Sequence, residues 1–134
     1  GGMMASLMTD LPGASKVFRG GVVSYHEGVK AQVLGVPEEM LAQYGAVSPQ
    51  VAEAMARGAK KLLGCDLAVS ATGVAGPDPD ERGNPVGLVF LGLAWEDQCI
   101  VQEFRAGNVA RERVRRMSAQ RGLDLVRRHL TGLL

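Results

Sequence analysis

One stretch of the sequence constrains the fold more than any other, because it predicts a long amphipathic helix that leads directly into a buried strand. Ser48 is a favourable N-cap, Pro49 suits the first helical position, where a missing N–H costs nothing, and Gly64 supplies the stop. Residues 67–71 follow at once as a short apolar run, which is typical of a strand buried on both faces. The apolar face of the helix consists of Val51, Ala52, Met55, Ala56, Ala59, Leu62 and Leu63.

The remaining segments alternate between helical and strand patterns. Helices are predicted over residues 3–11, 29–34, 38–43 and 108–130, and strands over residues 20–25, 87–94 and 99–104. The last two strands are separated by a short acidic turn and are expected to form a hairpin. Helices interleaved with strands favour an α/β sandwich with a mixed sheet.

Length and composition exclude several classes of protein. The chain has 134 residues, enough for one domain, and its charge-free runs reach only 13 residues, as over residues 83–95. A transmembrane helix needs about 18 apolar residues, and no signal peptide is visible. Cys65 and Cys99 lack metal-site spacing, and His26 and His129 stand apart from any ligand cluster. We therefore expect no metal, no membrane association and a cytoplasmic location.

Charge is distributed unevenly along the chain. Residues 1–103 carry 7 Lys and Arg against 12 Asp and Glu, a net charge of −5, whereas residues 104–134 carry 8 Arg against 2 acidic residues, a net charge of +6. A basic end suits a nucleic acid or a phosphorylated ligand. A solvated helix face with locally paired arginines is the alternative. An aromatic content of 4% argues against the stacking surfaces that bind nucleic acid.

Two segments before and after the central helix suggest chemistry. The sequence TGVAGP, residues 72–77, follows the buried strand, and its two glycines allow backbone N–H groups to approach a polar ligand. A plain tight turn fits the same pattern, and no GK[ST] follows to make a phosphate-binding P-loop. Tyr25 and Lys30 lie where a strand gives way to a short helix. A lysine in a semi-buried site can act as a base, although surface positions are the alternative for both residues.

The start of the chain and of the last helix offer two further candidates. Gly1 and Gly2 precede a helix pattern, which indicates free N–H groups for an anion or, alternatively, a cloning scar. Near the start of the last helix, one arginine of a run can clamp a phosphate with two parallel hydrogen bonds, and Arg111 is the best placed because it lies in the first turn. The alternative for the other arginines is salt bridges or solvent. The run consists of Arg111, Arg113, Arg115 and Arg116.

Together these segments resemble the CinA C-terminal domain family, the nicotinamide-mononucleotide deamidases. The resemblance extends over essentially the whole chain and rests on the ordered motifs GAVS (residues 45–48), TGVAGP (residues 72–77) and PVG (residues 85–87), with Lys30 five residues after Tyr25. It implies a three-layer α/β/α domain. It also implies hydrolysis of the carboxamide of nicotinamide mononucleotide to nicotinic acid mononucleotide and ammonia, by a serine paired with a lysine and without a cofactor.

The resemblance assigns roles to particular residues. Lys30 matches the general base, Tyr25 the tyrosine of the same pocket, and Thr72 a hydroxyl that faces the substrate. Arg111 matches an arginine that contacts phosphate, and Gly1 and Gly2 match the glycines of the family's ESCTGG motif. The residues whose backbone is expected to bind polar parts of the nucleotide are Gly73, Val74, Ala75 and Gly76.

The sequence also departs from the family pattern. The nucleophilic serine precedes Gly1 in the motif, as do a strand and helix, so residues 1–134 are expected to form one amidohydrolase domain that is incomplete at its N-terminus. We expect a small nucleotide as substrate and a homo-oligomeric assembly. The alternative is a non-catalytic nucleotide-binding or regulatory domain of a competence/damage-inducible protein.

Overall fold

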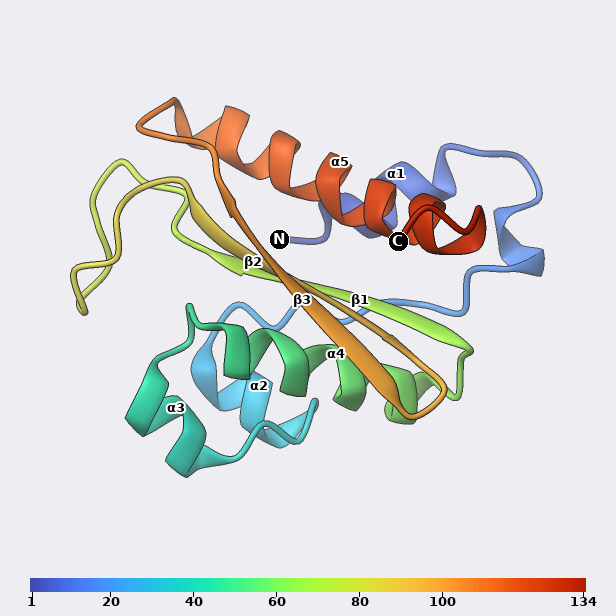
Figure 1. The fold of residues 1–134 in the computed structure, drawn as a ribbon, viewed down its shortest axis with the longest axis horizontal. Coiled ribbons are helices and arrows are strands. Elements are labelled where there is room, and N and C mark those ends of the chain that lie inside the picture. The colour runs from blue at the N-terminus through green and yellow to red at the C-terminus, as the bar shows by residue number, and fades with distance from the viewer.

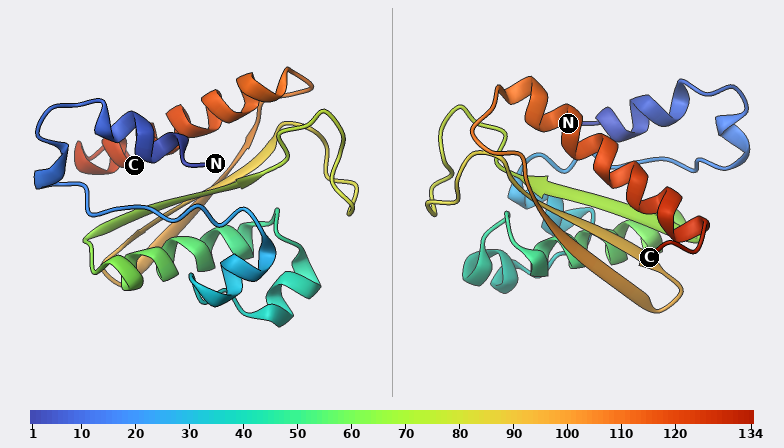
Figure 2. Two further views of the ribbon diagram at one scale, coloured as in Figure 1. Left: turned by 180° about the vertical axis from the view of Figure 1, so that it is seen from behind. Right: turned by 45° about the horizontal axis from the view of Figure 1, so that its top comes forward.

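The computed structural model describes all residues, 1–134, as three layers with a sheet in the middle (Figure 1). Helices α1 and α5 cover one face of the sheet, and α2, α3 and α4 cover the other (Figures 1 and 2). The α/β class is therefore confirmed. The elements are α1 (Met3–Thr9), the 3-10 helix η1 (Ala14–Lys16), α2 (Glu27–Gln32), α3 (Glu38–Tyr44), α4 (Pro49–Leu63), β1 (Leu67–Gly73), β2 (Leu88–Trp95), β3 (Gln98–Arg105) and α5 (Arg111–Leu130).

The sheet has three strands in the order β1-β2-β3, and both pairings are antiparallel. The predicted hairpin of β2 and β3 is confirmed, with Glu96 at positive φ in its turn. Central strand β2 is buried along its length up to Trp95, which is only partly buried. The expected mixed sheet is not formed by these residues, because all of their strand pairs run antiparallel.

Residues 20–25 are the reason for that difference. They were predicted to form a strand, and they run extended past β1 (Figures 1 and 2), but none of their backbone groups bonds to another backbone group. Branched residues give a segment β propensity, whereas a strand also needs a partner with matching register. The side chain of Val22 instead packs against the core beneath α4.

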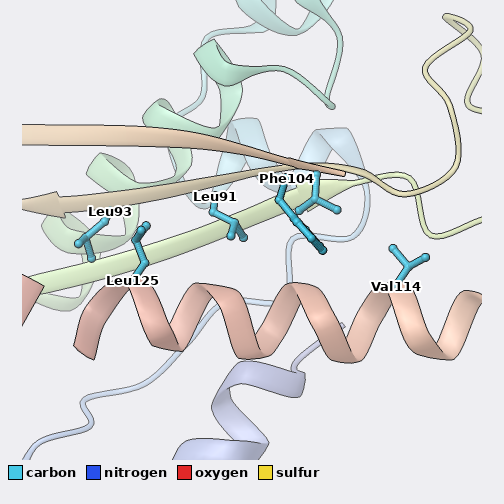
Figure 3. Packing of buried hydrophobic residues seen from close by; sticks show 6 residues of the cluster. Leu91, Leu93, Phe104, Val114 and Leu125 are labelled. Carbon is cyan, nitrogen blue, oxygen red and sulfur yellow. The ribbon is translucent and has the colours of Figure 1, made fainter. Parts of the chain in front are cut away.

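Two apolar cores hold the layers together. Between the sheet and α5, the strands contribute Val89, Leu91, Leu93 and Phe104, and α5 contributes Val114 and Leu125 (Figure 3). On the opposite face, Leu88 and Phe90 of β2 pack with Ala52 of α4. Because side chains alternate across a strand, β2 supplies both cores at once. A third cluster joins α4 to the segments around it, through Leu34, Val36, Leu41, Val51 and Met55.

The long amphipathic helix forms as predicted. The Ser48 hydroxyl accepts a hydrogen bond from the Val51 N–H at 3.3 Å, and Gly64 ends the helix in the left-handed conformation. Gly58 lies so close to the backbone after α2 that a Cβ atom there would be 1.9 Å from the Leu34 carbonyl oxygen. This contact presses α4 against the chain segment that carries Lys30. No helix in the structure is both long enough and apolar enough to cross a membrane.

Candidate active site

Arg111 joins two segments that are far apart in the sequence. Its Nη1 donates to the Gly76 carbonyl oxygen at 2.6 Å, and its Nη2 donates to the Tyr25 hydroxyl at 2.7 Å. Arg111 opens α5, one residue after its N-cap Ala110, and not within a helix that starts at Asn108 as predicted. The first turn of α5, the TGVAGP loop and the end of the extended segment therefore meet at one place.

Lys30 lies in the last turn of α2 and is buried, with 6% of its surface exposed. Its Nζ donates to the Ser24 carbonyl oxygen, so the amine is held against the segment that ends in Tyr25. Burial lowers the pKa of Lys30 below its ordinary value of 10.5, and the nearby Glu27 carboxylate opposes part of that effect. A lysine in this state can act as a base. His26, expected to be a turn residue, is the N-cap of α2 and accepts the Gly28 N–H through Nδ1 at 3.0 Å.

Gly1 lies beside this group of residues. The side chains of Arg115, Lys30 and Arg111 lie near the Gly1 nitrogen. The Nη2 atom of Arg115 is 3.5 Å from the position that a Cβ on Gly1 would occupy. Three basic side chains thus face the start of the chain from two different layers.

The TGVAGP loop offers backbone donors to this place. The Val74 N–H is occupied, because it donates to the Leu88 carbonyl oxygen at 2.9 Å. The N–H groups of Ala75 and Gly76 have no hydrogen-bond acceptor in the protein. These two N–H groups remain available to a ligand, whereas the N–H of Val74 is not available.

Comparisons with known proteins can now be added to this geometry. The family model of the CinA C-terminal domain matches residues 1–130. This chain belongs to the CinA C-terminal domain family. A CinA-like protein of Syntrophomonas wolfei is 49% identical over 131 residues, 97% of this chain and 31% of that protein. A CinA-like protein of Desulfovibrio desulfuricans is 44% identical over 135 residues, 99% of this chain and 32% of that protein. The CinA domain thus spans about a third of these curated relatives.

Solved structures agree with the family assignment. The competence/damage inducible protein CihA from Agrobacterium tumefaciens is 35% identical and superposes with a TM-score of 0.90 over 94% of this chain and 77% of that chain. A CinA superfamily protein from Escherichia coli is 28% identical, with a TM-score of 0.90 over 94% of this chain and 73% of that chain. The three-layer fold is therefore shared with proteins of known structure.

The structure of the CinA domain brings most of the predicted site residues together. Tyr25, Arg111 and Gly76 form one hydrogen-bonded group, and Lys30 lies beside it with Gly1. Thr72 differs, because its hydroxyl donates to the Ala46 carbonyl oxygen at 2.7 Å and makes no hydrogen bond to Lys30 or Tyr25. Its buried hydroxyl ties the GAVS segment to β1.

The sequence favours Arg111 and presents Arg115 only as one of the arginines in the same run. The signal was present, since Arg111 and Arg115 are four residues apart in a predicted helix and so lie on the same face. It did not stand out because Arg113 and Arg116 lie in the same run.

A cleft of about 390 Å³ borders Pro77, the last residue of the TGVAGP loop. Three of its lining residues are prolines. Arg82, in the loop between β1 and β2, donates to carbonyl oxygens at the end of α3 and so ties this loop to that helix. The lining residues are Pro77, Pro79, Pro85, Val86, Leu88, Arg105, Gly107 and Asn108. The structure contains no group of three or more His, Cys, Asp or Glu side chains placed to hold a metal ion.

Proposed function

We propose that this domain is a cytoplasmic amidohydrolase that converts nicotinamide mononucleotide to nicotinic acid mononucleotide and ammonia. The observation that carries the proposal is the buried amine of Lys30, held by the Ser24 carbonyl beside Tyr25, Arg111 and the TGVAGP loop. Membership of the CinA C-terminal domain family supports it. A neutral amine in a partly enclosed polar site suits the activation of a hydroxyl nucleophile.

The chemistry follows a serine–lysine scheme. Neutral Lys30 takes the proton from the serine hydroxyl that the ESCTGG motif supplies before Gly1, and the serine oxygen attacks the carboxamide carbon. The N–H groups of Gly1 and Gly2 stabilise the resulting oxyanion. The C–N bond then breaks as protonated Lys30 gives its proton to the leaving ammonia. Water, deprotonated by Lys30, attacks the acyl-enzyme and releases nicotinic acid mononucleotide with the serine restored.

The other residues position the substrate. The free N–H groups of Ala75 and Gly76 bind polar atoms of the nucleotide. Arg111 keeps their loop and Tyr25 at a fixed separation, because it bonds to both. Small shifts in such positioning groups reduce rates strongly, so we expect these contacts to matter for turnover.

Ammonia release from nicotinamide mononucleotide tests the proposal, with protein that includes the ESCTGG segment. The Lys30→Ala variant should lose about a thousandfold in turnover, because a general base typically supplies a factor of that order. Lys61→Ala is the matched control, since Lys61 is exposed on α4 and should leave turnover unchanged. Circular dichroism should show the same fold in both variants. Full activity of Lys30→Ala would rule out the serine–lysine scheme.

One observation favours a second function, binding of a nucleotide without hydrolysis. The free N–H groups of Ala75 and Gly76 offer polar contacts to a nucleotide that need no nucleophile. Such a domain would bind nicotinamide mononucleotide and release no ammonia. Titration calorimetry beside the ammonia assay separates the two functions.

A further inference from the structure

The loop between β1 and β2 is attached firmly at its base and only by polar contacts farther out. It projects from one end of the sheet (Figure 1), and residues 77–79 and 81–83 are exposed. At the base, the Val74 N–H donates to the Leu88 carbonyl oxygen at 2.9 Å, and the Gly87 N–H donates to the Val74 carbonyl oxygen at 2.8 Å. No residue from 77 to 85 belongs to an apolar core, so the outer part of the loop depends on hydrogen bonds for its position.

Asp80 gives this outer part a shape of its own. Its Oδ1 accepts from the backbone N–H groups of Arg82 and Asn84, at 3.0 Å and 2.8 Å, and its Oδ2 accepts from the Asn84 side-chain amide at 2.7 Å. The Asp80 N–H donates in turn to the Asn84 carbonyl oxygen at 3.2 Å. These bonds are internal to the loop, so they define a turn but do not fix where the turn lies relative to the helices.

Arg82 is the side chain that joins this turn to a helix. Its Nη1 donates to the Gln43 carbonyl oxygen at 3.3 Å, and its Nη2 donates to the carbonyl oxygens of Leu41, at 3.4 Å, and Ala42. The three acceptors lie in the last turn of α3, where a positive charge is favourable. No other hydrogen bond joins residues 77–86 to a helix.

The GAVS segment receives the chain on both sides of the ligand-binding backbone. Gly45 begins this segment, and a Cβ atom on it would lie 2.5 Å from the Arg82 Cδ atom and 2.6 Å from its Nε atom. The Arg82 side chain therefore lies directly against bare backbone. The next residue, Ala46, accepts the Thr72 hydroxyl at 2.7 Å. Residues 75 and 76, with their free N–H groups, thus lie between two attachments to one short segment.

We propose that Arg82 is a positioning residue, which holds the β1–β2 loop against α3 and so presets the Ala75 and Gly76 N–H groups for the nucleotide. This inference rests on the proposed function for the identity of the ligand. Without the Arg82 side chain, the base of the loop and the bond from Arg111 to Gly76 remain, whereas the outer turn loses its attachment. Ordering that part of the chain on binding then costs affinity.

The test compares Arg82→Ala with the parent, in protein that includes the ESCTGG segment, by NMR relaxation and by deamidation of nicotinamide mononucleotide. The amide order parameters of residues 78–84 should fall from about 0.85 to about 0.6 or lower, while those of β2 and α4 stay the same. KM should rise about three- to tenfold with little change in kcat, because a mobile loop must be ordered on binding. Arg82→Lys keeps a cationic donor and should recover part of both effects.

Arg57→Ala is the matched control. Arg57 is likewise exposed and donates to a distant backbone carbonyl, that of Asp97 at 2.9 Å. Asp97 lies in the turn between β2 and β3, at the other end of β2 from the β1–β2 loop. This variant should keep the order parameters of residues 78–84 and the KM of the parent. An equal rise of KM in both variants would show that the effect does not come from the β1–β2 loop.

The remaining outcomes separate this inference from the proposed reaction. Unchanged order parameters in Arg82→Ala would overturn the attachment of the loop by Arg82, and a mobile loop with an unchanged KM would overturn its positioning role. If the parent releases no ammonia, the deamidase proposal fails, and the calorimetric affinity for nicotinamide mononucleotide takes the place of KM. The inference then holds if Arg82→Ala weakens binding about three- to tenfold, and it is overturned if binding is unchanged or if the parent does not bind the mononucleotide.

Discussion

The two helical layers contribute basic residues to the site in opposite ways. The layer of α2, α3 and α4 supplies one lysine that is almost fully buried and bonded to a backbone carbonyl. The other layer supplies arginines from the start of α5, which are exposed. Both sets lie near Gly1.

The difference in exposure between Lys30 and the two arginines gives them different charge states. Burial penalises the charged form of Lys30 and so makes a base of it. Exposure leaves Arg111 and Arg115 charged, and arginine keeps its charge in almost any setting. In the proposed deamidase, the first layer would therefore supply the base, and the second would position the substrate. Three predictions examine this division, starting with the largest effect.

The pH dependence of deamidation should show the lowered pKa of Lys30. Only the neutral amine acts as a base, so kcat/KM should rise about tenfold per pH unit on the acid limb and level off once Lys30 is deprotonated. Because burial lowers this pKa, the plateau should begin below pH 10.5. A pH profile of ammonia release measures it. An acid limb that continues to pH 10.5 would show that Lys30 is an ordinary solvated lysine.

Gly58→Ala should loosen the layer that buries Lys30. The added Cβ would lie 1.9 Å from the Leu34 carbonyl oxygen, a backbone atom that cannot turn aside. We expect a loss of about 2–3 kcal/mol in the free energy of unfolding, as for an overpacked core. Urea denaturation measures the loss. In the remaining folded protein the acid limb should move to higher pH, because α2 becomes more hydrated.

The control for that variant is Lys61→Ala, an exposed change on the same helix. It should change stability by less than about 0.5 kcal/mol. Equal stability of Gly58→Ala and the parent would mean that α4 and the Leu34 backbone are not in close contact. If Gly58→Ala is destabilised but the acid limb of its pH profile stays at the same pH, the packing of α4 does not control the burial of Lys30.

A double-mutant cycle on Tyr25 and Arg111 should give the smallest effect. Tyr25→Phe removes only the hydroxyl that accepts from Arg111, and Arg111→Ala also frees the Gly76 carbonyl. We expect a coupling of about 1 kcal/mol in kcat/KM, because the two residues share one hydrogen bond. Steady-state kinetics of the four proteins measure it. Strictly additive losses would show that Arg111 does not act through Tyr25.

The sequence predicts the best-defined parts of the fold because their signals are local. The Ser48 cap, Pro49 and Gly64 delimit α4 to within a residue, and the acidic turn predicts the hairpin of β2 and β3. Residues 20–25 show the limit of such signals. Their β propensity is a local property, whereas strand pairing depends on what lies beside them in space.

The candidate site shows a similar limit. Motif spacing identified Tyr25, Lys30, Arg111 and the TGVAGP loop, and the structure brings them together. Spacing did not indicate that Arg111 is bonded to neutral groups or that Arg115 faces Gly1. It also did not indicate that the Thr72 hydroxyl bonds to Ala46. Such details depend on side-chain directions between elements, which the one-dimensional pattern does not contain.

The unpaired backbone of residues 20–25 has a consequence for motion. Displacing this segment breaks no bond between two backbone groups, but it breaks the bond from Lys30 to the Ser24 carbonyl oxygen and the bond from Arg111 to the Tyr25 hydroxyl. Lys30, by contrast, is buried in the helix that follows. Fewer hydrogen bonds therefore hold residues 20–25 than hold the strands of the sheet, and we expect amide hydrogen exchange to be faster in this segment than in β2.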